Sequence, residues 1–194
     1  MEIISKVKNI PVTPKTEWQV IETENKPHMK VFTNYVVPLS LIPAVAAFIG
    51  YGLVGYSVFG VHFSNVGWGI RQAIVQYAAI LCGTYITALI INTLSDSFGV
   101  KKDFGRAFSL VAYTYTPMFV AGMFYILPAL WWLASLAGLY SLYLLYIGLQ
   151  AIMKVPADKQ SSYCIISLII TVTVFGVLSL ILTTILLRGT YLRF

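Results

Sequence analysis

Residues 107–153 read AFSLVAYTYTPMFVAGMFYILPALWWLASLAGLYSLYLLYIGLQAIM, a stretch without Asp, Glu, Lys or Arg. As one helix it would be roughly 70 Å long at 1.5 Å per residue, about twice the ~30 Å thickness of a bilayer's hydrocarbon core. The stretch is therefore predicted to fold back on itself as a transmembrane hairpin. Pro128, followed by Trp131 and Trp132, is the predicted hinge, because proline ends a helix at the preceding residue and tryptophan favours the membrane interface.

The composition of the chain is that of an integral membrane protein. Of its 194 residues, 58% are hydrophobic and 10% are charged, whereas soluble domains carry about 25% charged residues. The net charge of +6 does not indicate a nucleic-acid partner, because the basic residues lie in loops and tails between apolar segments. Cys82 and Cys164 lie within apolar segments, so we expect packing thiols. The polar N-terminal residues lack the apolar core of a signal peptide, and no cleaved signal is expected.

The predicted fold is an all-α polytopic membrane protein with five transmembrane helices. The spans are expected at about residues 35–58, 71–94, 107–127, 129–153 and 165–187. They form a membrane domain over residues 33–188, between an arm of residues 1–32 and a tail of residues 189–194.

The first predicted span carries two prolines and a pair of small residues. Pro38 and Pro43 are expected to kink the helix, because each removes a backbone donor. Ala46 and Gly50 lie four residues apart, a spacing that lets another backbone approach closely.

The N-terminal arm is predicted to contain a short amphipathic helix. Thr13 as the N-cap and Pro14 at the first helical position form a helix start, and Pro27 ends the run. Trp18 and Ile21 lie on one face of this helix. We expect an interfacial helix on the membrane surface with Trp18 as its anchor. The alternative is a mobile tail with one incidental tryptophan.

The distribution of Lys and Arg predicts the orientation in the membrane. If the N-terminus is cytoplasmic, ten of the 13 basic residues lie on the cytoplasmic side and three, Arg71, Arg188 and Arg193, on the other. The ten are Lys6, Lys8, Lys15, Lys26, Lys30, Lys101, Lys102, Arg106, Lys154 and Lys159. Because cytoplasmic loops carry an excess of Lys and Arg, we predict a cytoplasmic N-terminus and, with five spans, a C-terminus outside.

Three groups of residues follow one another in an order that a known family shares. The arm carries Pro14, Trp18 and Ile21, similar to a bacterial "P…W..I" pattern. The second group is Asp96, Gly99, Phe104-Gly105-Arg106-Ala107-Phe108, Tyr113 and Pro117. The third is Gly138, Leu144, Gly148 and Leu149, followed by Lys154, similar to a "…Y.GL…" fourth helix. Together they resemble the YIP family of Ypt/Rab-interacting membrane proteins.

This resemblance implies a cytoplasmic N-terminal arm followed by five helices. The "DLYGP"-like signature of eukaryotic members has no clear counterpart in the second or third span, so the bacterial branch is the closer match. The implied location is the bacterial inner membrane, and the implied role lies in membrane organisation or trafficking.

Five residues form a candidate site for a protein partner or for lipid on the cytoplasmic side: Trp18, Asp96, Lys101, Lys102 and Arg106. Asp96 follows Asn92 by four residues and lies close in sequence to Arg106. It could bind a cation or pair with Arg106. The alternative is a solvated carboxylate that caps the loop.

Polar side chains within the predicted spans form a second candidate site: Gln72, Gln76, Asn92, Tyr113, Thr116, Pro117 and Gln150. Pro117 removes a donor from its helix and leaves a carbonyl of the preceding turn free. Uncharged polar groups in a bilayer usually bond between helices, at about 0.6 kcal/mol each. Two interpretations stay open, hydrogen bonds that join the helices and a lined cavity, and we favour the first.

No constellation in the sequence predicts catalysis, so no catalytic residue, metal or cofactor is expected. His28 and His62 fall on opposite sides of the membrane in the predicted topology and cannot share a metal. The sequence has no Ser-His-Asp or HExxH pattern and no glycine-rich phosphate loop. Asp96 and Glu17 are the remaining candidates for an acid pair near the membrane.

The preferred function is a non-enzymatic membrane scaffold or adaptor. Its arm and two basic loops would hold a protein partner or the anionic lipids of one leaflet, and a homo-oligomer stays open. The alternative is a small transporter or channel with a polar site between spans two, three and four. A third hypothesis is a lipid-handling protein with a lateral opening between helices.

Overall fold

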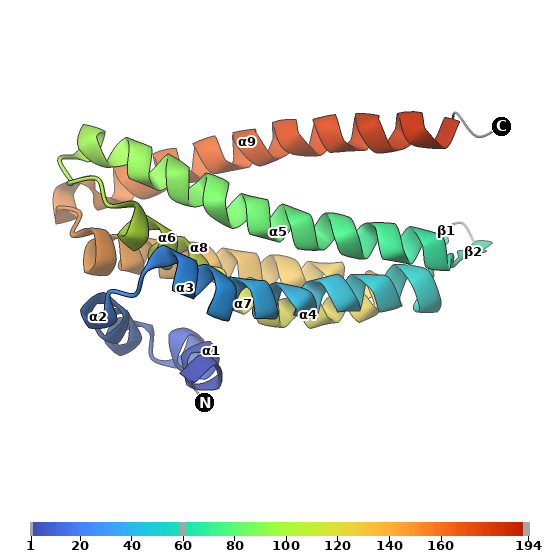
Figure 1. Cartoon of the computed structure of the whole chain (residues 1–194), viewed down its shortest axis with the longest axis horizontal. Helices are drawn as coiled ribbons and strands as arrows, with labels where there is room; N and C mark the ends of the chain where they lie inside the picture. Colours follow the sequence, from blue (N-terminus) through green and yellow to red (C-terminus); the bar gives the residue numbers. More distant parts are fainter. Residues whose placement is uncertain (1, 59–60, 192–194) are drawn as a thin grey trace.

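The computed structural model describes the backbone of residues 2–58 and 61–191, and the side chains of that part except at residues 2, 56–61, 131, 175, 176 and 178–191. Figure 1 shows long helices that run roughly side by side, with the arm against one end. The loops after α5 and after α8 lie at the same end as the arm. Strands β1 and β2 and the last turns of α9 lie at the opposite end.

The first helical run is longer than its predicted span. It comprises α3 (His28–Val31), η1 (Phe32–Val36), α4 (Val37–Phe48) and η2 (Ile49–Val54). The η1 turn is π-helical and ends at Val36, two residues before Pro38. A proline lacks the N–H that would continue the normal bonding pattern, and Val37 donates five residues back to Phe32. Pro38 therefore lies beside a widened turn.

Two short strands follow where the end of span one and a loop were expected. Strands β1 (Tyr56–Val58) and β2 (Val61–Phe63) pair in antiparallel register. Helix α5 (Val66–Leu94) then begins inside the predicted loop, because Asn65 caps it by accepting a hydrogen bond from the Trp68 N–H at 3.0 Å. The 3-10 turn η3 (Ser95–Phe98) extends this helix toward the next loop.

The hairpin predicted for residues 107–153 is present. The first half of the hairpin comprises α6 (Phe104–Thr114), α7 (Thr116–Ala121) and η4 (Gly122–Ile126). The chain becomes extended at Leu127 and turns at η5 (Pro128–Leu130), which confirms Pro128 as the hinge. The second half of the hairpin, α8 (Trp131–Met153), packs back along α6 and α7. All residues of α6 from Ala107 to Thr114 are buried, so α6 lies at the centre of the molecule.

Four helical runs in the described part of the chain are long and apolar enough to cross a membrane. They are His28–Val54, Val66–Phe98, Phe104–Ile126 and Pro128–Met153. The predicted fifth span, residues 165–187, falls within α9 (Ala157–Tyr191). Most of its side chains beyond residue 174 lie outside the described part, so the fifth crossing stays a prediction.

The close approach predicted at Ala46 and Gly50 is confirmed. Ala46 is buried, and a Cβ added to Gly50 would lie 3.3 Å from the backbone oxygen of Ile126 and closer still to that of Tyr125. The absence of a side chain at Gly50 thus lets η4 pack backbone to backbone on the first run.

Candidate functional site

The arm folds as two helices, α1 (Glu2–Val12) and α2 (Pro14–Glu24), which pack on each other and on the bundle. Helix α2 begins at Pro14 as predicted, with Thr13 in the N-cap position but without a capping bond from its side chain. Helix α1 was not predicted. The spacing of Val7 and Ile10, which both pack in the core, is the signal that could have revealed it.

Trp18 is buried in the protein and not in the membrane interface. Its side chain is 1% exposed. It packs against α8 at Gly148, where an added Cβ would lie 3.0 Å from Trp18 Cζ2. The prediction of Trp18 as a membrane anchor is therefore wrong, because the α2 face that carries it is covered by α8 and lipid cannot reach the indole.

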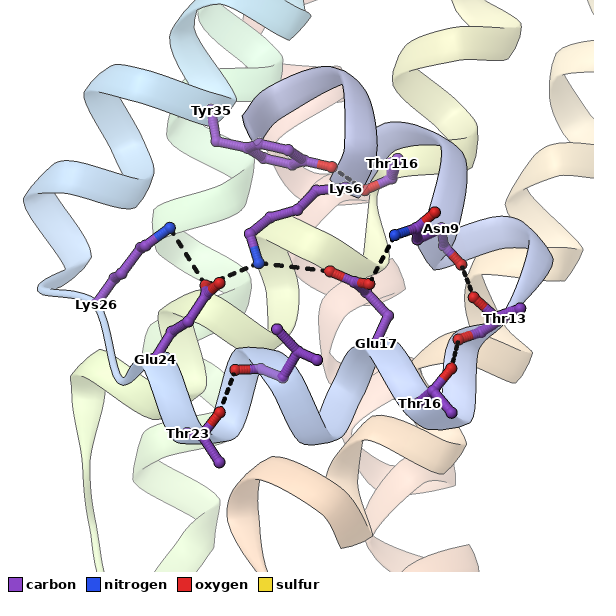
Figure 2. Close-up of polar contacts among 11 residues, drawn as sticks. Lys6, Asn9, Thr13, Thr16, Glu17, Thr23, Glu24, Lys26, Tyr35 and Thr116 are labelled. Carbon is purple, nitrogen blue, oxygen red and sulfur yellow. Dashed lines mark hydrogen bonds and ion pairs between the residues drawn. The ribbon is translucent and has the colours of Figure 1, made fainter. Parts of the chain in front are cut away.

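An ion cluster joins the two helices of the arm, buried at Lys6 and Glu17 and partly exposed at Glu24 and Lys26 (Figure 2). The Lys6 side chain is 4% exposed, and its Nζ lies 2.8 Å from Glu24 Oε2 and 3.5 Å from Glu17 Oε1. The Asn9 amide donates to Glu17 at 3.2 Å. Lys26 lies 3.2 Å from Glu24, and desolvation lowers the pKa of its ammonium group. We call Lys6, Glu17, Glu24 and Lys26 the arm cluster.

The arm cluster also contacts the bundle. Lys6 Nζ lies 5.4 Å from the ring centroid of Tyr113 on α6, close enough for a cation–π interaction. Lys154, in the loop after α8, lies 3.2 Å from Glu22 of α2. These contacts and the buried Trp18 fix the arm as a cap on the end of the helices. Sequence reasoning missed Lys6, because its partners come close only when α1 folds back on α2.

In the charged loop after α5, Asp96 is solvent-exposed and pairs with Lys102 and not with Arg106. Asp96 lies 2.6 Å from Lys102, in a pair whose side chains are 62% and 48% exposed, so it contributes little to stability. Arg106 lies 3.6 Å from Asp103 and donates to the carbonyl of Ile152 at 3.5 Å. Asp103 also caps α6. Of the cytoplasmic candidates, the structure joins Asp96 to Lys102, while Lys101 is exposed and Trp18 lies in the cap.

Glu17 and Asp96 do not form an acid pair, because each pairs with a lysine of its own segment. His28 packs edge-on against Phe104, with ring centroids 5.3 Å apart. Among the residues that the structure describes, no three His, Cys, Asp or Glu side chains lie together as metal ligands would.

Tyr113, Thr116 and Pro117 come together with Tyr35 of the first run. Pro117 has no N–H for the carbonyl of Tyr113, and the Thr116 hydroxyl donates to that carbonyl instead, at 2.6 Å. Thr116 Oγ1 also lies 2.7 Å from the Tyr35 hydroxyl. The carbonyl that the proline frees is therefore satisfied, and the same threonine ties span three to span one.

The other predicted intramembrane residues do not join this group. Gln150 is exposed and shares a hollow of about 340 Å³ between α2 and α8 with Trp18. Asn92 has a buried Oδ1 without a hydrogen-bond partner among the described residues. Gln72 is half-buried near the start of α5, and Gln76 lies one turn further along. The seven residues thus do not form one polar seam.

Gln76 lines a cavity of about 650 Å³ between α5, α6, α7, α8 and α9. None of the described residues that line it is Asp, Glu, Lys, Arg or His. Thr87 and Tyr115 both line it and bond to each other, with their hydroxyls 2.9 Å apart. The Thr114 hydroxyl is buried and has no partner within the described part. The cavity is thus mostly apolar, with a few hydroxyl groups and the Gln76 amide.

Comparisons with known proteins agree with this architecture. Residues 8–181 match the model of the Yip1 domain. The chain is 29% identical over 179 residues to the protein described as Inner membrane protein YohC from Escherichia coli strain K12, and equally to YohC from E. coli O6:H1. Each alignment covers 89% of this chain and 91% of the relative. No solved structure matches.

Proposed function

The chain belongs to the Yip1 domain family, and from that premise we propose that it is a non-enzymatic scaffold of a bacterial inner membrane. In this proposal its cytoplasmic end gathers anionic lipids and a protein partner. The observation that carries it is the docked arm. The arm places its own exposed lysines beside the two loops that carry the other basic residues of this end.

The exposed lysines come from three separate segments. They are Lys8, Lys15 and Lys30 of the arm region, Lys101 and Lys102 of the first loop, and Lys154 and Lys159 of the second. A lysine close to an anionic leaflet contributes about 1 kcal/mol of attraction. Lys6 does not take part, because Glu17 and Glu24 neutralise it within the arm cluster. The buried contacts of the cap do not use Lys8, Lys15, Lys30, Lys101 or Lys159, which stay available to lipid, whereas Lys102 and Lys154 face Asp96 and Glu22.

The arm also offers a surface for a protein partner. Ile4 and Val12 of α1 are 75% and 71% exposed, and Val20 of α2 is 45% exposed. Exposed apolar side chains beside basic ones suit a partner that combines apolar and acidic groups. A second copy of this chain could also be the partner, in which case the arm surfaces of two copies would contact each other in a homo-oligomer.

The cellular setting of the proposal rests on the relative and on the charge distribution. YohC of E. coli is described as an inner membrane protein. Ten of the 13 basic residues lie in the arm and in the two loops at its end of the bundle. Both points support a cytoplasmic location for the capped end.

The test is the lipid preference of the protein in vesicles of phosphatidylcholine with a minor fraction of phosphatidylglycerol. Spin-labelled phosphatidylglycerol should associate with the protein more than spin-labelled phosphatidylcholine, and 1 M salt should weaken the preference because the Debye length falls to about 3 Å. Replacement of Lys15, Lys30 and Lys101 by Gln should reduce it. Arg71→Gln, at the other end of the bundle, is the matched control. An equal preference in the triple variant and the wild type would contradict the proposal.

A small transporter is the second candidate function, because the intramembrane cavity reaches Gln76 between spans two, three and four. In this proposal the Gln76 amide contacts the solute. Proteoliposomes should then take up small polar solutes faster than empty liposomes, and Gln76→Leu should abolish the difference. Uptake at the rate of empty liposomes would rule this candidate out.

A further inference from the structure

The intramembrane cavity is continuous with the side of the helix bundle. Met118 of α7 and Val172 of α9 both line it and are 43% and 62% exposed. Both residues lie well inside apolar helices, so the molecules next to this opening in a bilayer are the hydrocarbon chains of lipids. Deeper in, Thr114 and Ser141 line the same cavity and are 3% exposed each.

The lining selects for an apolar occupant. It contains no charged side chain among the described residues, and most of the surface that it exposes is apolar. An ion or a lipid headgroup would lose its hydration there without gaining a charged partner, which costs several kcal/mol. A hydrocarbon chain has no such penalty.

The cavity reaches the backbone of α8 at Gly138, where no side chain fills the space. Gly138 of α8 lines the cavity, and a Cβ added there would have no atom within 4 Å outside its own helix. At Gly148, ten residues further along α8, an added Cβ would instead meet Leu110 and Trp18. The cavity therefore lies beside Gly138 and ends before the arm.

We infer that this cavity is a binding site for one acyl chain of a membrane lipid, which enters from the side between the helices. The volume of about 650 Å³ holds roughly 20 groups of the ~30 Å³ that a water molecule occupies in the liquid, and a methylene group is of similar size. That is about the length of a single lipid chain. The site is separate from the basic residues at the capped end, so a test of acyl-chain binding can succeed or fail independently of the proposed scaffold function.

The experiment uses the full chain in vesicles of phosphatidylethanolamine and phosphatidylglycerol, with a fraction of the phosphatidylglycerol carrying a diazirine in the middle of one acyl chain. After irradiation, mass spectrometry locates the labelled residues. We expect labels at Thr114 and Ser141, which a chain outside the protein cannot reach, as well as at Leu89 on the outer surface, which is 51% exposed.

Gly138→Phe should fill the cavity with a side chain. The variant should still fold, because the new side chain enters open space and because glycine disfavours a helix by about 1 kcal/mol. Labelling of Thr114 and Ser141 should fall about tenfold, equivalent to about 1.4 kcal/mol of lost affinity. Labelling of Leu89 should not change and reports on folding. Leu139→Phe is the matched control, because Leu139 is the next residue and is 64% exposed.

Two results would overturn the inference. The first is a wild type labelled at Leu89 but not at Thr114 or Ser141, which means that the cavity is empty or is filled by a helix of a second copy. The second is unchanged labelling of Thr114 and Ser141 in Gly138→Phe, which means that the label reaches them by another route.

Discussion

Thr114 and Thr116 lie two residues apart, but only the hydroxyl of Thr116 is hydrogen-bonded within the described part of the chain. Thr116 bonds to Tyr35 and to the carbonyl of Tyr113, whereas Thr114 has a buried hydroxyl with no partner among the described residues. Thr116→Val should lower the free energy of unfolding by about 0.5–1.5 kcal/mol, because it leaves polar groups unsatisfied. Thr114→Val should leave it unchanged or raise it. Detergent-induced unfolding of both variants checks this, and an equal loss in the two would contradict it.

Gly148 makes room for Trp18, and this contact is the point where the arm meets α8. Gly148→Val should overpack the site by about 1–3 kcal/mol and displace the arm. We expect faster tryptic cleavage after Lys15 and faster amide exchange across α2. Gly138→Val is the matched control on the same helix, since the space beside it is open. Equal cleavage in the two variants would show that Trp18 does not hold the arm.

At the scale of single residues, the sequence pointed to several groups that matter but not to their partners. Pro117 was expected to free a carbonyl, and the structure shows Thr116 satisfying it. Asp96 was considered with Arg106 and pairs with Lys102. Partner choice depends on how the turns and helices are rotated relative to one another, and local patterns carry no information about that rotation.

The arm depends on the arm cluster, in which Lys6 is enclosed by Glu17 and Glu24. Lys6→Met should destabilise the docked arm by about 3 kcal/mol, because it removes the lysine that faces the buried Glu17 carboxylate, whereas Glu24 keeps Lys26. Amide exchange of α2 should accelerate accordingly, and a further Glu17→Gln change should restore part of the protection. Lys8→Met changes an exposed lysine on the same helix and is the control. The same exchange rate in Lys6→Met and Lys8→Met would contradict this role.

At the scale of elements, hydropathy and proline positions predicted the hairpin of residues 107–153 and the start of α2. The same signals missed α1, the strands β1 and β2, and the extension of the first run back to His28. Hydropathy marks the segment that must lie in hydrocarbon, and a helix continues beyond it wherever its next turn packs on protein. Helix α6 supplies that packing here, because His28 and Phe32 pack against Phe108. Helix α1 depends on its contacts with α2 and α7, which the chain brings together only when it folds.

For the whole molecule, the predicted orientation and the number of crossings can be tested together. In a chain whose Cys82 and Cys164 are replaced by Ala, single cysteines are introduced as Lys101→Cys in the capped end and Asn65→Cys at the opposite end. A membrane-impermeant maleimide on intact spheroplasts should label Asn65→Cys, whereas Lys101→Cys should react only after lysis, because the excess of Lys and Arg holds the capped end inside. The reverse pattern would invert the topology.

A third variant, Thr190→Cys, decides whether α9 crosses the membrane. With five spans its thiol lies on the same side as Asn65→Cys and should react in intact spheroplasts. If α9 does not cross, it should behave like Lys101→Cys. The basis for expecting a crossing is the length of residues 165–187, about 35 Å as a helix, which exceeds the ~30 Å hydrocarbon core and permits slight tilt. A protected Thr190→Cys would leave both termini on the cytoplasmic side and would contradict the arrangement in which α9 runs along α5 to the opposite end of the bundle (Figure 1).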